Sequence, residues 1–219
     1  TLAANPSGET PARATLVEDL LETAYELCKH DPQGALRLAQ EALSGLAGQQ
    51  QHQAAHAFLF IGKIYYQQAQ LSEALSALEN AYQQFKQAGD SFLTLESLLE
   101  LGRVHRDLGH FEKAAKHFEY ALILAQETNY PQGEVDAMNL QASVYNSQGK
   151  TATALKCLQE SLTIAERYAL REQQANILSN IGTLHTSLGN YPSALEALRT
   201  AHRWLQELTP HSRSEASNL

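Results

Sequence analysis

The repeating unit of this chain is clearest in residues 180–198, which read NIGTLHTSLGNYPSALEAL. The stretch predicts the end of one helix, a tight turn at Gly189-Asn190 and the start of a second helix, because Gly and Asn tolerate the left-handed backbone at which helices stop. Small residues stand at Gly182 and, twelve positions later, at Ala194. Antiparallel helices approach closely only where the side chains between them are small, so we expect these positions to lie at the contact within the pair.

The same pattern recurs at intervals of forty residues along the chain. The first small position holds Gly62, Gly102, Ala142 and Gly182, the second holds Ala74, Ala114, Ala154 and Ala194, and a third holds Ala81, Ala121, Ser161 and Ala201. Four copies in phase predict a repeat protein, in which each unit buries its apolar face only by stacking on its neighbours.

Apolar residues recur at helical spacing and never alternate with period two, which predicts an all-α protein of about five antiparallel helix pairs. We expect a repeat domain over residues 13–208, with repeats at about 14–48, 52–88, 91–128, 131–168 and 171–208. Residues 1–12 are expected to form a flexible arm and residues 209–219 a flexible tail. Asp31-Pro32 predicts a helix start, and Gly109, Gly149 and Gly189 predict left-handed helix ends.

The composition excludes several classes of partner. The formal charge of -8 argues against nucleic acid, which would require clustered Lys and Arg. No apolar run approaches the roughly 20 residues that cross a bilayer, so no membrane association is expected. Cys28 and Cys157 lie far apart and have no cysteine at metal or redox spacing, which predicts thiols in a reducing, cytoplasmic compartment. A first residue of Thr rather than Met suggests an excised segment.

Catalytic and metal-binding motifs are not found, so we expect no enzyme activity, cofactor or metal. His52 and His56 are four residues apart on one predicted helical face, but no third ligand is evident, and a surface pair is the simpler interpretation. His105 and His185 are expected to be packed structural residues. No Gly-rich phosphate loop, nucleophile elbow or pair of catalytic acids is present.

The repeat positions resemble the tetratricopeptide repeat (TPR). The matching residues are Phe58, Ile61, Gly62, Tyr65, Ala74, Leu78 and Ala81, then Leu98, Leu101, Gly102, His105, Ala114, Phe118 and Ala121, then Met138, Gln141, Ala142, Tyr145, Ala154, Leu158 and Ser161, and finally Leu178, Ile181, Gly182, His185, Ala194, Leu198 and Ala201. The period of forty is longer than the usual 34 or so and is similar to the longer-helix variant of kinesin light chains, spindle-orientation scaffolds and bacterial regulators. The resemblance implies an α-solenoid, a right-handed superhelix whose first helices line a concave groove.

In members of that family the groove binds a protein or peptide. The equivalent face here carries His56, Phe60, Lys63, Tyr66 and Gln67 in the second repeat, Glu96, Glu100, Arg103, Arg106 and Asp107 in the third, Asp136, Asn139, Ser143 and Asn146 in the fourth, and Asn176, Asn180 and Thr183 in the fifth. Amide side chains both donate and accept hydrogen bonds, so a row of Asn is suited to clasping an extended peptide backbone. The alternative is a polar face that is only solvated.

Two interpretations of the charged residues remain open. Lys63, Arg103 and Arg106 could bind an acidic partner, or neighbouring acidic residues could neutralise them by pairing. The carboxylate clamp of chaperone-binding relatives is not expected, because its Lys and Asn positions hold Leu59 and Lys63.

The last predicted helix carries Trp204, Leu205 and Leu208, which could leave an apolar edge. The tail could fold over it, a second copy could dock as a homodimer, or the natural chain could continue. The functional hypothesis is a protein- or peptide-binding scaffold, such as the sensory or docking module of a bacterial signalling protein. The alternatives are a peptide-gated regulator and a self-assembling structural subunit.

Overall fold

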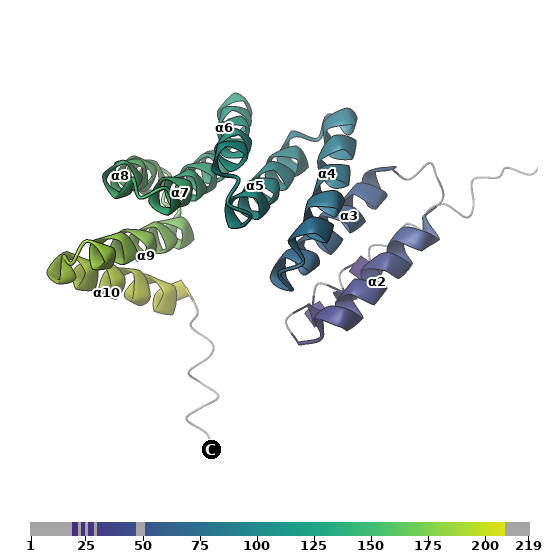
Figure 1. The fold of residues 1–219 in the computed structure, drawn as a ribbon, viewed down its shortest axis with the longest axis horizontal. Helices are drawn as coiled ribbons and strands as arrows, with labels where there is room; N and C mark the ends of the chain where they lie inside the picture. Colours follow the sequence, from purple (N-terminus) through teal and green to yellow (C-terminus); the bar gives the residue numbers. More distant parts are fainter. Residues whose placement is uncertain (1–18, 22, 25, 29, 47–50, 209–219) are drawn as a thin grey trace, which may run out of the picture. The chain divides into compact units, whose positions relative to one another are not determined.

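The computed structural model describes residues 19–21, 23–24, 26–28, 30–46 and 51–208, and in this part of the chain the regular elements are all helices. They are α2 (Pro32–Gly45), α3 (Gln51–Gln67), α4 (Leu71–Ala88), α5 (Ser91–Asp107), α6 (Phe111–Glu127), α7 (Pro131–Ser147), α8 (Thr151–Arg167), α9 (Arg171–Ser187) and α10 (Tyr191–Leu208) (Figure 1). From α3 onward the first and last residues of each helix pair lie within one residue of the predicted repeat bounds. The expected arm and tail lie outside the described residues.

The helices group into two compact units, residues 1–109 and 110–219. In the first unit α2 packs on α3, α3 on α4, and α4 on α5, while α3 also contacts α5. In the second unit each helix from α6 to α9 packs on the next, and α7 also contacts α9. Within each unit, consecutive helices therefore pack together, and the first helices of successive repeats lie side by side. This confirms the predicted all-α packing.

The small positions of the repeat lie at the tightest contacts between helices. Ala74, Ala114 and Ala154 are fully buried. A Cβ atom added to Gly62 would lie 2.6 Å from Cγ of Leu78, and one added to Gly182 would lie 2.6 Å from Cγ of Leu198. The glycine thus packs mainly against the leucine sixteen positions later. The alanine twelve positions later is also small, so the two helices of the repeat stay close together.

Left-handed residues end most of the helices. Gly109, Gly149 and Gly189 have φ of 75°, 74° and 73°, as the sequence predicted, and Gly89 has φ of 73°. At the other ends the left-handed residue is not glycine but Ala69 (φ 57°), Asn129 (φ 51°) or Ala169 (φ 53°). The amide of Leu170, after Ala169, donates to the carbonyl of Ala165 at 2.9 Å, which closes the α8 end. An alanine there carries a steric cost that a glycine does not.

The N-terminus of α2 confirms the predicted start. The Asp31 side chain accepts a hydrogen bond from the backbone N–H of Gly34 at 2.9 Å, and Pro32 occupies the first helical position. Asp90 caps α5 in the same way, accepting from the N–H of Leu93 at 3.0 Å. Each carboxylate satisfies a donor that the helix itself leaves unpaired.

Replacing Gly62 by Ala is expected to lower the free energy of unfolding by about 1–3 kcal/mol, because the new methyl group overlaps Leu78. Urea denaturation followed by circular dichroism measures the change. Gly45→Ala is the matched control, since Gly45 is also helical and nothing lies within 4 Å of an added Cβ. Equal stability of the two variants would contradict the close contact.

Replacing Ala169 by Gly is expected to raise the free energy of unfolding by about 0.5–1 kcal/mol, since the relieved backbone strain exceeds the added entropy of the unfolded chain. The control is Ala152→Gly in α8, where the backbone is helical and the same change should be neutral or destabilising. A loss of stability in Ala169→Gly would show that the left-handed residue is not strained.

Candidate functional site

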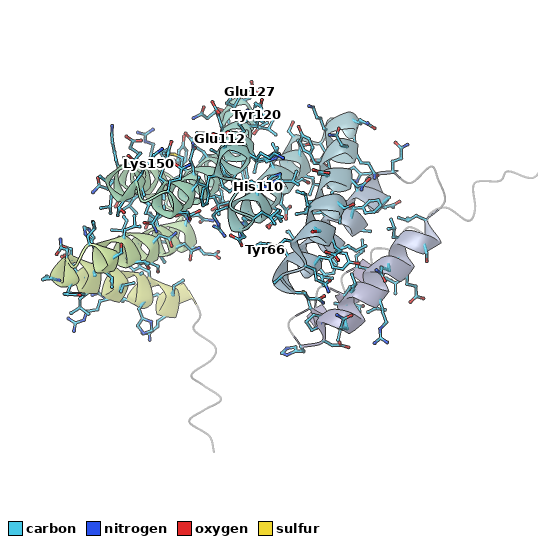
Figure 2. The ribbon with its side chains drawn as sticks, viewed as in Figure 1. Tyr66, His110, Glu112, Tyr120, Glu127 and Lys150 are labelled. Carbon is cyan, nitrogen blue, oxygen red and sulfur yellow. The ribbon has the colours of Figure 1, made fainter. Side chains whose placement is uncertain are left out.

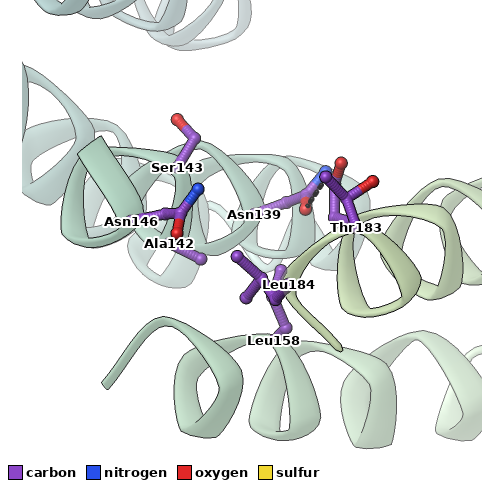
Figure 3. Close-up of a pocket in the computed structure, with 8 residues that line it drawn as sticks. Asn139, Ala142, Ser143, Asn146, Leu158, Thr183 and Leu184 are labelled. Atoms are coloured by element: carbon purple, nitrogen blue, oxygen red, sulfur yellow. Dashed lines mark hydrogen bonds between the residues drawn. The ribbon is translucent and has the colours of Figure 1, made fainter. Parts of the chain in front are cut away.

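A small hollow opens between α7 and α9 in the second unit, and it is the best candidate site. Its lining consists of Asn139, Ala142, Ser143 and Asn146 from α7, Leu158 from α8, and Asn180, Thr183 and Leu184 from α9. Figure 3 shows Asn139 and Asn146 of α7, Thr183 of α9, and the side chains of Leu158 and Leu184. None of the lining residues is charged.

The two sides of the hollow are joined by a hydrogen bond between asparagines. Asn180 Nδ2 donates to Asn139 Oδ1 at 2.7 Å (Figure 3). This bond uses the donor of one amide and an acceptor of the other, so the Asn139 NH2 and the Asn180 carbonyl oxygen retain opposite hydrogen-bonding capacity side by side. That is the pair of groups required by a peptide unit, which presents one C=O and one N–H.

The size of the hollow restricts what can enter it. Its volume is about 70 Å³, whereas an engineered cavity of roughly 150 Å³ is needed to hold a benzene ring. Leu158 and Leu184, both almost fully buried, form an apolar floor. The arrangement suits a small aliphatic side chain whose own backbone lies at the rim, and it is much smaller than typical cofactor pockets of about 300–1,000 Å³.

The sequence predicted five of the lining residues, Asn139, Ser143, Asn146, Asn180 and Thr183, and the structure brings all five to one hollow. It did not predict the floor. Ala142 and Leu158 are the small position and the leucine sixteen positions later, the same relationship as Gly62 and Leu78. The spacing of sixteen residues is visible in the sequence, but by itself it indicates only helix packing.

On the first unit, the corresponding face of α3 and α5 is covered by pairs of charged and polar side chains. Lys63 forms an ion pair with Glu96 across the two helices. Tyr66 donates from its hydroxyl to Asp107 Oδ2 at 2.6 Å, and Arg106 donates to Asp107 Oδ1 at 2.8 Å (Tyr66 is labelled in Figure 2). Pairing with acidic neighbours is thus the interpretation that the geometry favours for Lys63 and Arg106.

The protonation of this cluster follows from its contacts. Partial desolvation works to raise the pKa of Asp107, but hydrogen bonds from Arg106 and Tyr66, with the positive charges nearby, outweigh it and hold the pKa below its ordinary value. Desolvation and the hydrogen bond to the Asp107 carboxylate raise the pKa of Tyr66. The carboxylate is therefore ionised and the phenol neutral at physiological pH.

Other predicted groove residues have different neighbours. Gln67 Oε1 accepts a hydrogen bond from the Cys28 thiol at 2.8 Å, and Phe60 packs against the core between α2 and α3. Within α5, Arg103 Nε lies 3.9 Å from Glu100 Oε2. Asp136 is half-buried on α7, and Asn176 is exposed on α9.

The two histidines near the start of α3 contact an acidic and an aromatic side chain of the same unit. His52 Nε2 lies 3.0 Å from Asp90 Oδ2. The rings of His52 and His56 pack edge-on against each other and against Phe85 of α4. Among the described residues, no group of three or more His, Cys, Asp or Glu is arranged to hold a metal ion.

A second hollow surrounds Cys157 on the α6, α7 and α8 side of the second unit. It has a volume of about 300 Å³, and Met138, Gln141 and Tyr145 of α7 contribute to its lining. The thiol donates to the Met138 carbonyl at 3.3 Å. Burial, reinforced by the charge of Glu160, raises the pKa of Cys157 to about 11, so the sulfur is protonated and is a poor nucleophile.

Of the three residues predicted to form an apolar edge on α10, only one is seen to be exposed. Trp204 is half-buried, with the Arg171 guanidinium carbon 5.3 Å from its ring centroid. Leu205 is exposed, and the side chain of Leu208 lies outside the described part. The apolar side chains most exposed on this helix are others, Tyr191 and Leu195.

Comparison with known proteins identifies relatives of the same architecture. The family model described as "MalT-like TPR region" matches residues 21–217. Tetratricopeptide repeat protein 29 of Trypanosoma brucei brucei (strain 927/4 GUTat10.1) is 27% identical over 127 residues, which are 58% of this chain and 26% of that protein. None of the helices in the described residues is both long enough and apolar enough to span a membrane.

Three solved structures have the same fold at low sequence identity. BtubC (BKLC) from P. vanneervenii has a TM-score of 0.67 at 18% identity, with 90% of each chain covered. The Rap conjugation gene regulator of plasmid pLS20 with the Phr* peptide scores 0.72 at 16%, covering 96% of this chain and 60% of that one. A Rap protein with competence and sporulation factor scores 0.69 at 15%, covering 90% and 65%. This chain spans less than two thirds of both Rap proteins.

Replacing Asp107 by Asn is expected to lower the free energy of unfolding at pH 7 by about 0.5–1 kcal/mol, because a partly exposed network loses its central charge. The lowered pKa means that the contribution is complete above the ordinary carboxyl value of 3.8 and is lost as pH falls through the folded-state value. Urea titrations of the wild-type protein and the variant, run from pH 7 to strongly acidic pH, measure the difference between their free energies of unfolding. That difference should shrink as the pH falls below 3.8. The exposed Glu119→Gln variant serves as control, and a pH-independent difference would contradict the assignment.

Proposed function

The chain belongs to the MalT-like TPR family, and from this premise we propose that it is a protein-binding scaffold whose α7–α9 hollow clasps an extended peptide segment of its partner. The hydrogen bond between Asn139 and Asn180 carries the proposal. It presents an amide donor and an amide acceptor at the rim of an apolar hollow, and a peptide backbone complements both.

The contrast between the two units supports this location. On α3 and α5 the polar groups already satisfy one another, so a ligand there must first break the pairs of Lys63 with Glu96 and Tyr66 with Asp107. At the α7–α9 hollow a ligand adds hydrogen bonds without breaking the one between the asparagines. Binding to the second unit therefore has the smaller desolvation cost.

The chemistry of the hollow also indicates which segment fits. The absence of charge from the lining residues disfavours a charged side chain at the central position of the ligand. The volume of about 70 Å³ favours Ala, Val or a residue of similar size. A second candidate is a peptide-gated regulator, favoured by the likeness to the Rap conjugation gene regulator in complex with the Phr* peptide. For both candidate functions we place the protein in the cytoplasm, since Cys28 and Cys157 are both free thiols.

A displayed library of random peptides, selected on the purified chain, tests the proposal. Selected peptides are expected to bind the Asn139→Ala, Asn180→Ala double variant at least about tenfold more weakly, because two hydrogen bonds to the ligand backbone are lost. Methylating the peptide nitrogen that meets Asn180 should have a similar effect. Asn176→Ala is the matched control, because Asn176 is also exposed on α9 but does not line the hollow.

Full binding by the double variant would reject the asparagine clasp, and failure to select any peptide would reject the peptide ligand. The radius of gyration from small-angle X-ray scattering, with and without a selected peptide, then separates the two candidates. A change on binding indicates the gated regulator, and an unchanged radius indicates the passive scaffold.

A further inference from the structure

Gln141 of α7 departs from the repeat at a position where the other copies are apolar. The equivalent residues, at intervals of forty, are Ile61, Leu101 and Ile181, which are 5%, 1% and 8% exposed. Gln141 is half-buried. A buried amide lowers stability unless its groups are hydrogen-bonded, whereas an aliphatic residue at the same place stabilises the core. Departures of this kind from a local pattern are typical of functional positions.

The contacts of the Gln141 amide leave most of its hydrogen-bonding capacity unused. Its Nε2 donates to the Tyr145 hydroxyl at 3.5 Å, which is longer than the usual range of about 2.7–3.2 Å. Among the described residues, none donates a hydrogen bond to Oε1 of Gln141. Since the Tyr145 oxygen accepts in this contact, its own O–H remains available to donate. An acceptor and a donor therefore lie side by side, one helical turn apart on α7.

Both residues line the second hollow described above, which surrounds Cys157 and is here called the Cys157 hollow. It shares no lining residue with the α7–α9 hollow and opens on a different face of α7. Its volume of about 300 Å³ is about twice that of the engineered cavity that holds benzene, and it reaches the lower end of the range for small-molecule pockets. The Cys157 hollow thus has room for a compact molecule of about ten non-hydrogen atoms.

One end of the Cys157 hollow is apolar. The Cys157 thiol donates to the Met138 carbonyl at 3.3 Å, so the two residues are level with each other on α8 and α7. Gln126 of α6 donates to Glu134 of α7 at 3.0 Å. Leu122 and Met138 each lie one turn farther from the junction of these two helices, so they are level as well. Sulfur atoms make favourable contacts with aromatic rings, so this end suits an aromatic group.

The other end of the Cys157 hollow is polar. The turn at residues 148–150 joins α7 to α8, so the two helices run antiparallel and their ends near the turn lie together. Tyr145 is seven residues closer to that turn than Met138, and Thr153 is four residues closer than Cys157. At a rise of about 1.5 Å per residue, the hollow spans about 10 Å along α7. A ligand can therefore place an apolar group at one end and a polar group at the other.

The charges at the Cys157 hollow cancel. Its two charged lining residues are Lys156 and Glu160, both exposed on α8, with Lys156 Nζ 3.8 Å from Glu160 Oε1. An ion in the hollow would meet one charge of each sign, so neither a cation nor an anion gains net attraction. The Cys157 thiol, whose pKa is raised to about 11, adds no charge at physiological pH. The lining therefore favours an uncharged ligand.

We propose that the Cys157 hollow binds a small uncharged molecule that carries an amide at one end and an aromatic ring at the other. The amide N–H donates to Gln141 Oε1, and the amide carbonyl accepts from the Tyr145 hydroxyl. The ring lies toward Leu122, Met138 and Cys157. The ligand supplies the hydrogen-bond partners that the fold does not give Gln141, which explains an amide at a core position of the repeat.

Met138 is the one methionine of the sequence, so a chain labelled with ¹³C at the methionine methyl group gives an NMR signal from the hollow itself. The probe is isoindolin-1-one, an uncharged bicyclic lactam of about ten non-hydrogen atoms. Its addition is expected to shift the Met138 signal saturably, with a dissociation constant of about 1 mM or below. N-methylisoindolin-1-one lacks the N–H that meets Gln141 and should bind at least about tenfold more weakly.

Gln141→Leu restores the aliphatic residue of the other repeats, so this variant should fold, and it should bind isoindolin-1-one at least about tenfold more weakly than the wild-type protein. It should also lose the preference for isoindolin-1-one over the N-methyl form. Gln159→Leu is the matched control, because Gln159 is exposed on α8 and does not line the hollow, and its affinity should equal that of the wild type. No saturable shift up to about 10 mM, equal binding of the two lactams, or equal binding by Gln141→Leu and the wild-type protein would overturn the proposal.

Discussion

The contact between a leucine and the backbone of a small residue sets the distance between the two helices of a repeat, and the rest of the structure depends on that distance. Leu78 packs on Gly62 and Leu198 on Gly182, with no room for even one additional carbon. Once the helices are that close, the alanines at the neighbouring positions are fully enclosed. The first helices of adjacent repeats can then lie side by side, as α7 and α9 do, and the polar residues that face outward from them form one surface.

Within each unit, the polar groups on this face differ in whether they already satisfy one another. The α3 and α5 side chains have opposite charges within reach, so they stabilise the helix pair and hold Asp107 ionised. The polar side chains that line the hollow between α7 and α9 are neutral amides and hydroxyls, and a hydrogen bond joins Asn139 to Asn180. Hydrogen-bonding capacity that the fold does not use remains for a ligand. Two faces at equivalent positions of the repeat therefore differ in the hydrogen-bonding capacity that the fold leaves unused.

The fold could be predicted in detail because its determinants are local and repeated. The small positions and the turns within the repeats recur, so Gly149 could be assigned from its register, and Asp31 could be assigned because it stands directly before Pro32. The junctions between repeats were harder to predict. Ala169 has a left-handed backbone that alanine disfavours, and the packing of the flanking helices imposes it. The residue type therefore carried no signal.

The amino-acid sequence by itself determined the helices, their pairing and the five polar residues that line the hollow, because each depends on spacing along one helix. Only the tertiary structure decided which groups meet. That Lys63 reaches Glu96, that Asn180 bonds Asn139, and that Leu158 forms a floor beneath them are contacts between helices. The exposure of Leu198 is the same kind of case. Leu198 and Leu158 occupy the same position of the repeat, but α9 follows and packs on α8, whereas no helix follows α10 in the described part of the chain.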